Sequence, residues 1–100
     1  MRGTPTLPSH VPSPDQDREL LLYKFDACPY CRRVLSQISR LGVTVPTRDT
    51  ARDSGARDEL RERTGRTQVP CLFVDGEPLF ESSDINVWLA AYAERATPSS

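Results

Sequence analysis

Two thiols lie three residues apart in the segment Cys28-Pro29-Tyr30-Cys31, which follows an apolar run and opens a helical pattern. Cys28 is therefore predicted at a helix N-terminus, where unpaired N–H groups and the helix dipole favour a thiolate. The dipole supplies about 0.3–2 kcal/mol, so a more strongly stabilised thiolate needs hydrogen bonds to sulfur or a cation such as Lys24 or Arg32. The spacing predicts redox chemistry, with Cys28 as the attacking thiol and Cys31 as the resolving thiol.

The same two cysteines have two alternative interpretations, half of a zinc site or a pair of buried structural residues. A structural zinc site takes four ligands, and the chain adds only Cys71 and His10, so no metal is predicted. Cys71 follows a proline in an apolar run, where a free cysteine is most simply a small buried hydrophobe. A Cys28–Cys31 disulfide needs Cβ atoms about 3.8 Å apart, whereas residues i and i+3 of a helix are about 5–6 Å apart. Cys28 must therefore lie outside regular helical geometry.

The hydrophobic pattern predicts the elements that position these thiols. Alternating and continuous apolar runs predict four strands, and apolar residues at helical spacing predict three helices, the last starting near Ser83 as N-cap. In chain order, the strands are 19–25, 43–48, 69–74 and 78–81, and the helices start at Cys28, Asp53 and Ser83. Gly42 and Gly65 are predicted to end the first two helices.

This order, β-α-β-α-β-β-α, restricts the topology. A strand–helix–strand opening requires a right-handed parallel crossover, and Asp75-Gly76 predicts a closing antiparallel hairpin. Pro46 favours an edge position for the second strand. The predicted class is α/β, with a four-stranded mixed sheet flanked by three helices on both faces.

Composition limits the remaining functions. The chain has 100 residues and a formal net charge of -1, so it has no general electrostatic signature for nucleic acid or membranes. No apolar stretch predicts a membrane span or a secretory signal, and a cytoplasmic location is expected. Residues 1–18 hold three hydrophobic residues and four of the nine prolines. They are predicted to be a disordered tail, with residues 19–96 as the folded domain and 97–100 as a frayed end.

A second motif, Gly65-Arg66-Thr67-Gln68-Val69-Pro70, opens the third predicted strand, where a proline indicates special backbone geometry. Together with the cysteine motif, the Asp75-Gly76 turn and the Ser83-Asp84 helix start, it makes residues 20–94 resemble a dithiol glutaredoxin of the thioredoxin superfamily. The segment 80–85 also resembles the Glu-Ser region of glutathione transferase N-terminal domains, here Glu81-Ser82.

The resemblance implies a thioredoxin-like fold and a site for glutathione. Cys28 matches the nucleophile, Cys31 the resolving thiol, and Tyr30 a residue lining the glutathione groove. Val69-Pro70, preceded by Gln68, matches the cis-proline step whose backbone pairs with glutathione. Ser83-Asp84 matches the pair that holds the γ-glutamyl end, and Arg66 is a candidate partner for the glycyl carboxylate.

The implied activity is glutathione-dependent reduction of protein disulfides or protein–glutathione mixed disulfides by a monomer. Glutathione would be the cosubstrate, and disulfide-bonded or glutathionylated proteins the partners. One alternative is a [2Fe–2S] carrier that uses Cys28 and glutathione, although Pro29 stands where cluster-binding members more often have Gly. Another is a reductase supplied by thioredoxin reductase or a different low-molecular-weight thiol.

Overall fold

The first strand, β1 (Leu20–Lys24), lies inside a four-stranded sheet of order β2-β1-β3-β4 in the computed structural model, which describes residues 10–96. It runs parallel to β2 (Thr47–Asp49) and antiparallel to β3 (Cys71–Val74), which pairs antiparallel with β4 (Glu77–Leu79). Leu22 and Tyr23 of β1 are fully buried in two different hydrophobic clusters. Burial on both faces explains why the strand is almost continuously apolar. The predicted mixed sheet is confirmed.

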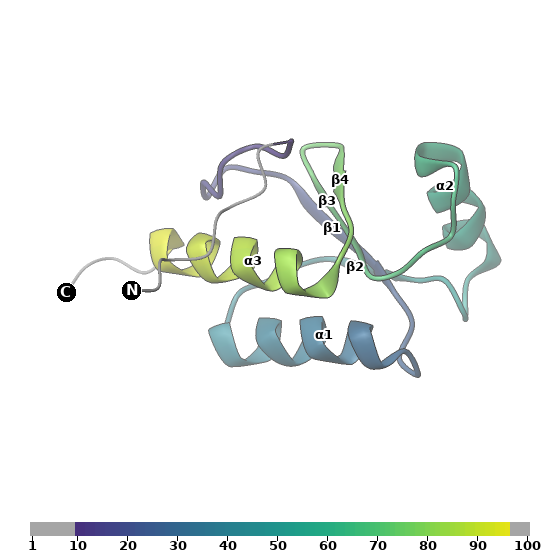
Figure 1. Ribbon diagram of the computed structural model, residues 1–100, viewed down its shortest axis with the longest axis horizontal. Helices are drawn as coiled ribbons and strands as arrows, with labels where there is room; N and C mark the ends of the chain where they lie inside the picture. Colours follow the sequence, from purple (N-terminus) through teal and green to yellow (C-terminus); the bar gives the residue numbers. More distant parts are fainter. Residues whose placement is uncertain (1–9, 97–100) are drawn as a thin grey trace.

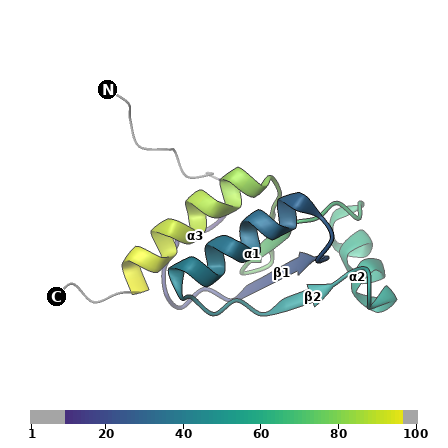
Figure 2. The same cartoon turned by 90° about the horizontal axis from the view of Figure 1, so that it is seen from below.

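The three helices lie on both sides of this sheet (Figure 1). Figure 2 shows α1 (Pro29–Leu41) and α3 (Ser82–Ala96) side by side on one face. Their larger cluster includes Val34, Trp88 and Leu89 packed against Leu22. On the other face, α2 (Ser54–Thr64) contributes Ala56 and Leu60 to the cluster around Tyr23. None of the described helices is long and apolar enough to cross a membrane.

The helix ends follow the predicted glycines. Gly42 and Gly65 have φ values of 71° and 81°, a left-handed conformation that glycine adopts at little steric cost. At the other end of α2, Asp53 accepts hydrogen bonds from the N–H groups of Gly55 and Ala56, at 3.0 and 3.3 Å. The N-cap therefore lies at the predicted start of this charged helix.

Several element boundaries differ from the prediction, and four of these differences have a local cause. β2 begins at Thr47 because the chain before it pairs with β1 only through the Pro46 carbonyl, which accepts from the Leu22 N–H at 2.9 Å. β3 begins at Cys71, after the Pro70 that has no N–H to donate. β4 ends at Leu79 and α3 begins at Ser82, because Glu81 adopts a φ of 64° that ends the extended chain. The Glu81 carbonyl then accepts from the Ile85 N–H at 3.0 Å, so the predicted cap Ser83 lies inside the helix.

A polar cluster anchors α2 to the sheet. The buried Tyr23 hydroxyl donates to the Glu59 carboxylate and accepts from Arg63 Nη1 at 3.3 Å. Burial and the hydrogen bond to Glu59 raise the pKa of Tyr23. The Arg63 guanidinium also lies 4.1 Å from the centre of the Phe73 ring. Charged residues of α2 thus contact the sheet as well as solvent.

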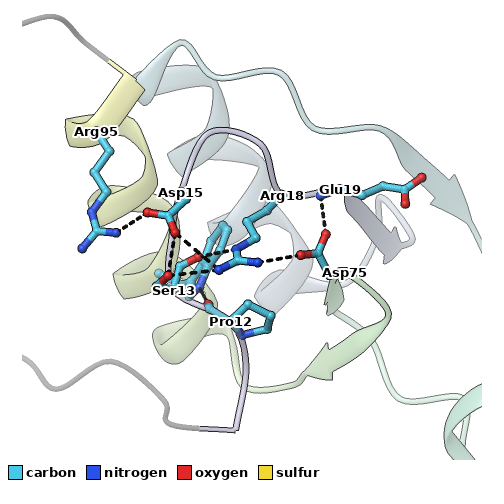
Figure 3. A network of polar contacts seen from close by, with 8 residues as sticks. Pro12, Ser13, Asp15, Arg18, Glu19, Asp75 and Arg95 are labelled. Carbon is cyan, nitrogen blue, oxygen red and sulfur yellow. Dashed lines mark hydrogen bonds and ion pairs between the residues drawn. The ribbon is translucent and has the colours of Figure 1, made fainter.

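The described part of the predicted disordered tail, residues 10–18, lies against the domain (Figure 3). Val11 is buried in the main cluster, and the Pro12 carbonyl accepts from Trp88 Nε1 at 2.9 Å. Gln16 Nε2 donates to the Tyr92 carbonyl at 2.8 Å, and Arg95 pairs with Asp15 at 2.7 Å. This departure from the prediction has a physical reason: prolines reduce the entropy lost on ordering, and α3 supplies the partners. Residues 1–9 and 97–100 of the predicted ends lie outside the described residues.

The same segment is also joined to the turn between β3 and β4. Arg18 pairs with Asp75 at 3.0 Å, and the other Asp75 carboxylate oxygen accepts from the Glu19 N–H at 2.7 Å. The hydrogen bond from the Glu19 N–H, and then the contact with Arg18, lower the pKa of Asp75. The predicted turn residue is therefore an attachment point for the N-terminal segment.

Replacing Val11 by Ala tests this packing. Removing two buried methyl groups is expected to lower the free energy of unfolding by about 1–2 kcal/mol, as measured by urea denaturation. The exposed Asp17 in the same segment is the matched control, and Asp17→Asn should change stability by less than about 0.5 kcal/mol. Equal, negligible effects of both substitutions would show that the segment does not pack.

Candidate active site

Cys28 lies at the junction between the loop after β1 and the first turn of α1. Its φ and ψ of -76° and 122° are extended, and Pro29 occupies the first helical position, where no N–H is needed. The Cys28 carbonyl accepts from the Arg32 N–H at 3.0 Å, so the helix begins directly after it. Cys28 therefore lies outside regular helical geometry, which closure of a disulfide with Cys31 requires. The first turn of α1 contains no acidic residue that would oppose a thiolate.

Cys31 is the buried member of the pair. It is fully enclosed, whereas Cys28 is partly exposed, and both are free thiols. Burial above all, together with a hydrogen bond to Cys28, raises the pKa of Cys31 to about 12. At neutral pH Cys31 is consequently protonated, and Cys28 is the thiol that solvent and substrates reach.

The two cations expected near the thiols are largely engaged elsewhere. Lys24 Nζ lies 2.7 Å from Asp26 Oδ1 and 3.3 Å from Asp49 Oδ2, in a side chain only 14% exposed. Arg32 Nε donates to the Asp26 carbonyl at 3.2 Å. Lys24 is thus neutralised by two carboxylates, which leaves the helix N-terminus as the main positive element at Cys28.

A groove of about 340 Å³ runs between the start of α1, the segment before β3 and the start of α3. The Val69–Pro70 peptide bond is cis, as the resemblance implied. Tyr30 is 56% exposed, and the Arg33 guanidinium lies 5.5 Å from the centre of its ring. Five of the predicted site residues line this groove, namely Tyr30, Gln68, Val69, Pro70 and Ser83. Glu81 and Ser82, which the transferase resemblance indicated, also line it, together with Arg33, which was not predicted. We refer to it as the cysteine-side groove.

Two predicted residues do not line the cysteine-side groove. Arg66 lies with its guanidinium 4.6 Å from the centre of the Phe80 ring and donates to Gln68 Oε1 at 3.1 Å. Asp84 is exposed in the first turn of α3. The carboxylate that lines the groove is that of Glu81, and the sequence signal for it was the Glu81-Ser82 resemblance to transferase domains.

Cys71 is enclosed at the start of β3, on the face covered by α2. Burial raises the pKa of its thiol to about 12. This environment fits the expected role of a small buried hydrophobe. Substrates do not reach this thiol, and it is packed in the cluster around Tyr23, whereas Cys31 lies beside Cys28.

Alkylation should distinguish the three thiols. With iodoacetamide at pH 7–8, mass spectrometry is expected to find Cys28 modified while Cys31 and Cys71 remain intact. Thiols ionise as the pH rises through their pKa, and values of about 12 leave on the order of one thiolate in ten thousand at pH 8. Unfolding in urea is the control and should expose all three. Rapid modification of Cys31 in the folded protein would contradict its buried assignment.

Comparison with known proteins gives the family. The sequence model of the glutaredoxin family matches residues 20–79. Glutaredoxin 3 of Escherichia coli K12 is 31% identical over 64 residues, which cover 64% of this chain and 77% of that protein. The fold is similar to a glutaredoxin from Archaeoglobus fulgidus, with a TM-score of 0.60 and 17% identity over 74% of this chain and 88% of that one.

A glutathione transferase homologue from Drosophila mojavensis, solved with bound glutathione, has a TM-score of 0.65 and 20% identity. The match covers 77% of this chain and 36% of the transferase homologue. These similarities confirm the predicted thioredoxin-like fold. The chain belongs to the glutaredoxin family and is a glutaredoxin-type thiol–disulfide oxidoreductase.

Proposed function

We propose that this oxidoreductase is glutathione-dependent and works through the Cys28/Cys31 dithiol. The observation that carries the proposal is the pairing of a partly exposed Cys28 at a helix start with an enclosed, protonated Cys31. The cysteine-side groove begins two residues away at Tyr30. The partners of the protein would be glutathione and disulfide-bonded or glutathionylated proteins, and the protein would act as a monomer.

With a protein–glutathione mixed disulfide, the Cys28 thiolate attacks the glutathione sulfur. A Cys28–glutathione bond forms, the protein–glutathione bond breaks, and the protein leaves as a thiolate that takes up a proton. The thiolate of a second glutathione then attacks the Cys28-bound glutathione. Oxidised glutathione is released and Cys28 returns as a thiolate. This route consumes one free glutathione, because the other half of the oxidised product is the glutathione removed from the protein.

With a protein disulfide, Cys28 first forms a mixed disulfide with one protein sulfur and the other leaves. Cys31 then loses its proton and attacks the Cys28 sulfur, which closes the Cys28–Cys31 disulfide and releases the second protein thiol. Two glutathiones reduce this disulfide and become oxidised glutathione. The adjacent positions of the two thiols support this second route.

The cysteine-side groove suits the chemistry of glutathione. The backbone of Val69 offers a strand-like partner to its cysteinyl residue. The Glu81 carboxylate complements the γ-glutamyl ammonium, and N–H groups at the start of α3, next to Ser82 and Ser83, complement its α-carboxylate. Arg66 supports this wall by holding Gln68, and Asp84 adds negative charge outside the groove.

Substitution of Glu81 tests the γ-glutamyl assignment. Glu81→Gln keeps the shape and removes the charge, so the KM for glutathione should rise by up to about fivefold. Glu81→Gly should also raise the KM for glutathione. The same substitution should increase the free energy of unfolding by about 1 kcal/mol, because the φ of 64° at Glu81 strains a residue that has a Cβ. The exposed Glu94 is the control, and Glu94→Gln should leave KM unchanged. An unaltered KM in Glu81→Gln would exclude contact with the ammonium.

The donor is identified by turnover of a glutathionylated peptide with glutathione and glutathione reductase, or with thioredoxin reductase. Turnover with glutathione alone is expected. Turnover only with thioredoxin reductase would contradict glutathione dependence while leaving the oxidoreductase chemistry in place. No observation on the described residues favours the iron–sulfur carrier as a second function.

A further inference from the structure

We infer that the exposed face of α1 is a docking surface for an acidic peptide segment of the protein substrate, an inference that rests on the proposed function. A groove of about 360 Å³ lies along this face, separate from the cysteine-side groove. It is lined by Arg32, Arg33, Ser36, Gln37, Arg40 and Asn86. We call it the basic groove.

The basic groove is positively charged, although the chain as a whole has a formal net charge of -1. Helix α1 contains three arginines and no acidic residue. Among the described residues, Arg33 and Arg40 form no ion pair, and Arg32 donates to a backbone carbonyl. Elsewhere Arg18 and Arg95 are each paired with a carboxylate, and the arginines of α2 alternate with acidic residues of the same helix. The groove therefore offers guanidinium donors that a carboxylate can approach without displacing an existing partner.

The spacing of the arginines favours a peptide over a small anion. Arg33 and Arg40 are seven residues apart in α1, about 10 Å along the helix. A small anion therefore reaches one of them, whereas a peptide with several acidic side chains brings a carboxylate to each.

The position of the groove connects it to catalysis. Arg33 lines both the basic groove and the cysteine-side groove. From Cys31 to Arg40 the helix rises about 14 Å, a length that about four extended residues span. A peptide whose cysteine sulfur is bonded to glutathione in the cysteine-side groove can thus lay its next residues along α1.

The test compares two S-glutathionylated peptides of equal length, one with aspartates and one with serines beside the cysteine. The unmodified protein should deglutathionylate the acidic peptide with a kcat/KM about five- to tenfold higher at low salt, and the difference should vanish in high salt. The variant Arg40→Gln/Gln37→Glu should lose this preference. Neither residue lies in the cysteine-side groove, so turnover of a small symmetric disulfide should be retained.

The control variant, Arg57→Glu, changes the charge by the same two units but on α2 instead of α1. Arg57 is exposed on α2, and Arg57→Glu should keep the preference for the acidic peptide. Equal turnover of both peptides by the unmodified protein would overturn the docking surface and leave the proposed function intact. Absence of glutathione-dependent turnover, even of the small disulfide, would overturn the proposed function and this inference with it. Variant-sensitive binding of a short oligonucleotide, without a peptide preference, would assign the groove to another polyanion and overturn the inference.

Discussion

Replacement of Cys28 by Ser is expected to abolish reduction of both glutathionylated peptides and protein disulfides, by at least about a thousandfold in kcat/KM. A hydroxyl at the start of α1 cannot replace the thiolate that both reactions require. Cys31→Ser should separate the two activities: deglutathionylation by the monothiol route persists within about threefold, while dithiol reduction of proteins is lost. Single-turnover and steady-state assays with the two substrate types measure both effects.

Cys71→Ala is the matched control for these cysteine variants. Because Cys71 is enclosed on the other face of the sheet, its replacement should leave both activities of the folded protein unchanged. Residual activity in Cys28→Ser, or loss of activity in a folded Cys71→Ala, would refute the assignment of roles. Loss of deglutathionylation in Cys31→Ser would show instead that the monothiol route does not operate.

The second large effect is expected at Trp88, which links the main cluster to the N-terminal segment. Trp88 is fully buried, its ring stacks 5.3 Å from that of Tyr92, and its indole N–H donates to the Pro12 carbonyl at 2.9 Å. Trp88→Ala should cost about 3–5 kcal/mol by opening a cavity. Because a domain of this size has a total stability of about 5–10 kcal/mol, the variant should lose roughly half of its free energy of unfolding.

Trp88→Phe keeps much of the buried ring and removes the donor to Pro12, so a smaller loss of about 1–2 kcal/mol is expected. Urea denaturation followed by circular dichroism gives both values. In the background of Val11→Ala, the Trp88→Phe effect should change, because both residues hold the same segment. Strict additivity of the two substitutions would mean that the segment and Trp88 are not coupled.

Local patterns account for most of the architecture that the sequence predicted correctly. The apolar run of β1, the helical spacing from Cys31 to Leu41 and the Asp75-Gly76 turn each act over a few residues. Such patterns depend on periodicity and on backbone preferences that are encoded locally. They were sufficient for the element order, the mixed sheet and the location of Cys28 before a helix.

The exact boundaries of the elements and the positions of several groove residues depend on how the chain packs. Glu81 and Ser82 line the cysteine-side groove because a left-handed residue starts α3 earlier than the serine pattern predicts. Arg66 lies against Phe80 and Gln68, a position that its neighbours in sequence do not determine. These features follow from packing between elements.

The sequence by itself determined the family resemblance, the order of the elements and which cysteine precedes the helix, because these depend on residue type and spacing. Only the tertiary structure decided how far each thiol is enclosed, and this burial raises the pKa of both Cys31 and Cys71 to about 12. It also decided that residues 10–18 lie against the domain. That segment is too poor in apolar residues to fold alone, and its order comes from the indole, carbonyl and arginine partners that α3 brings to it.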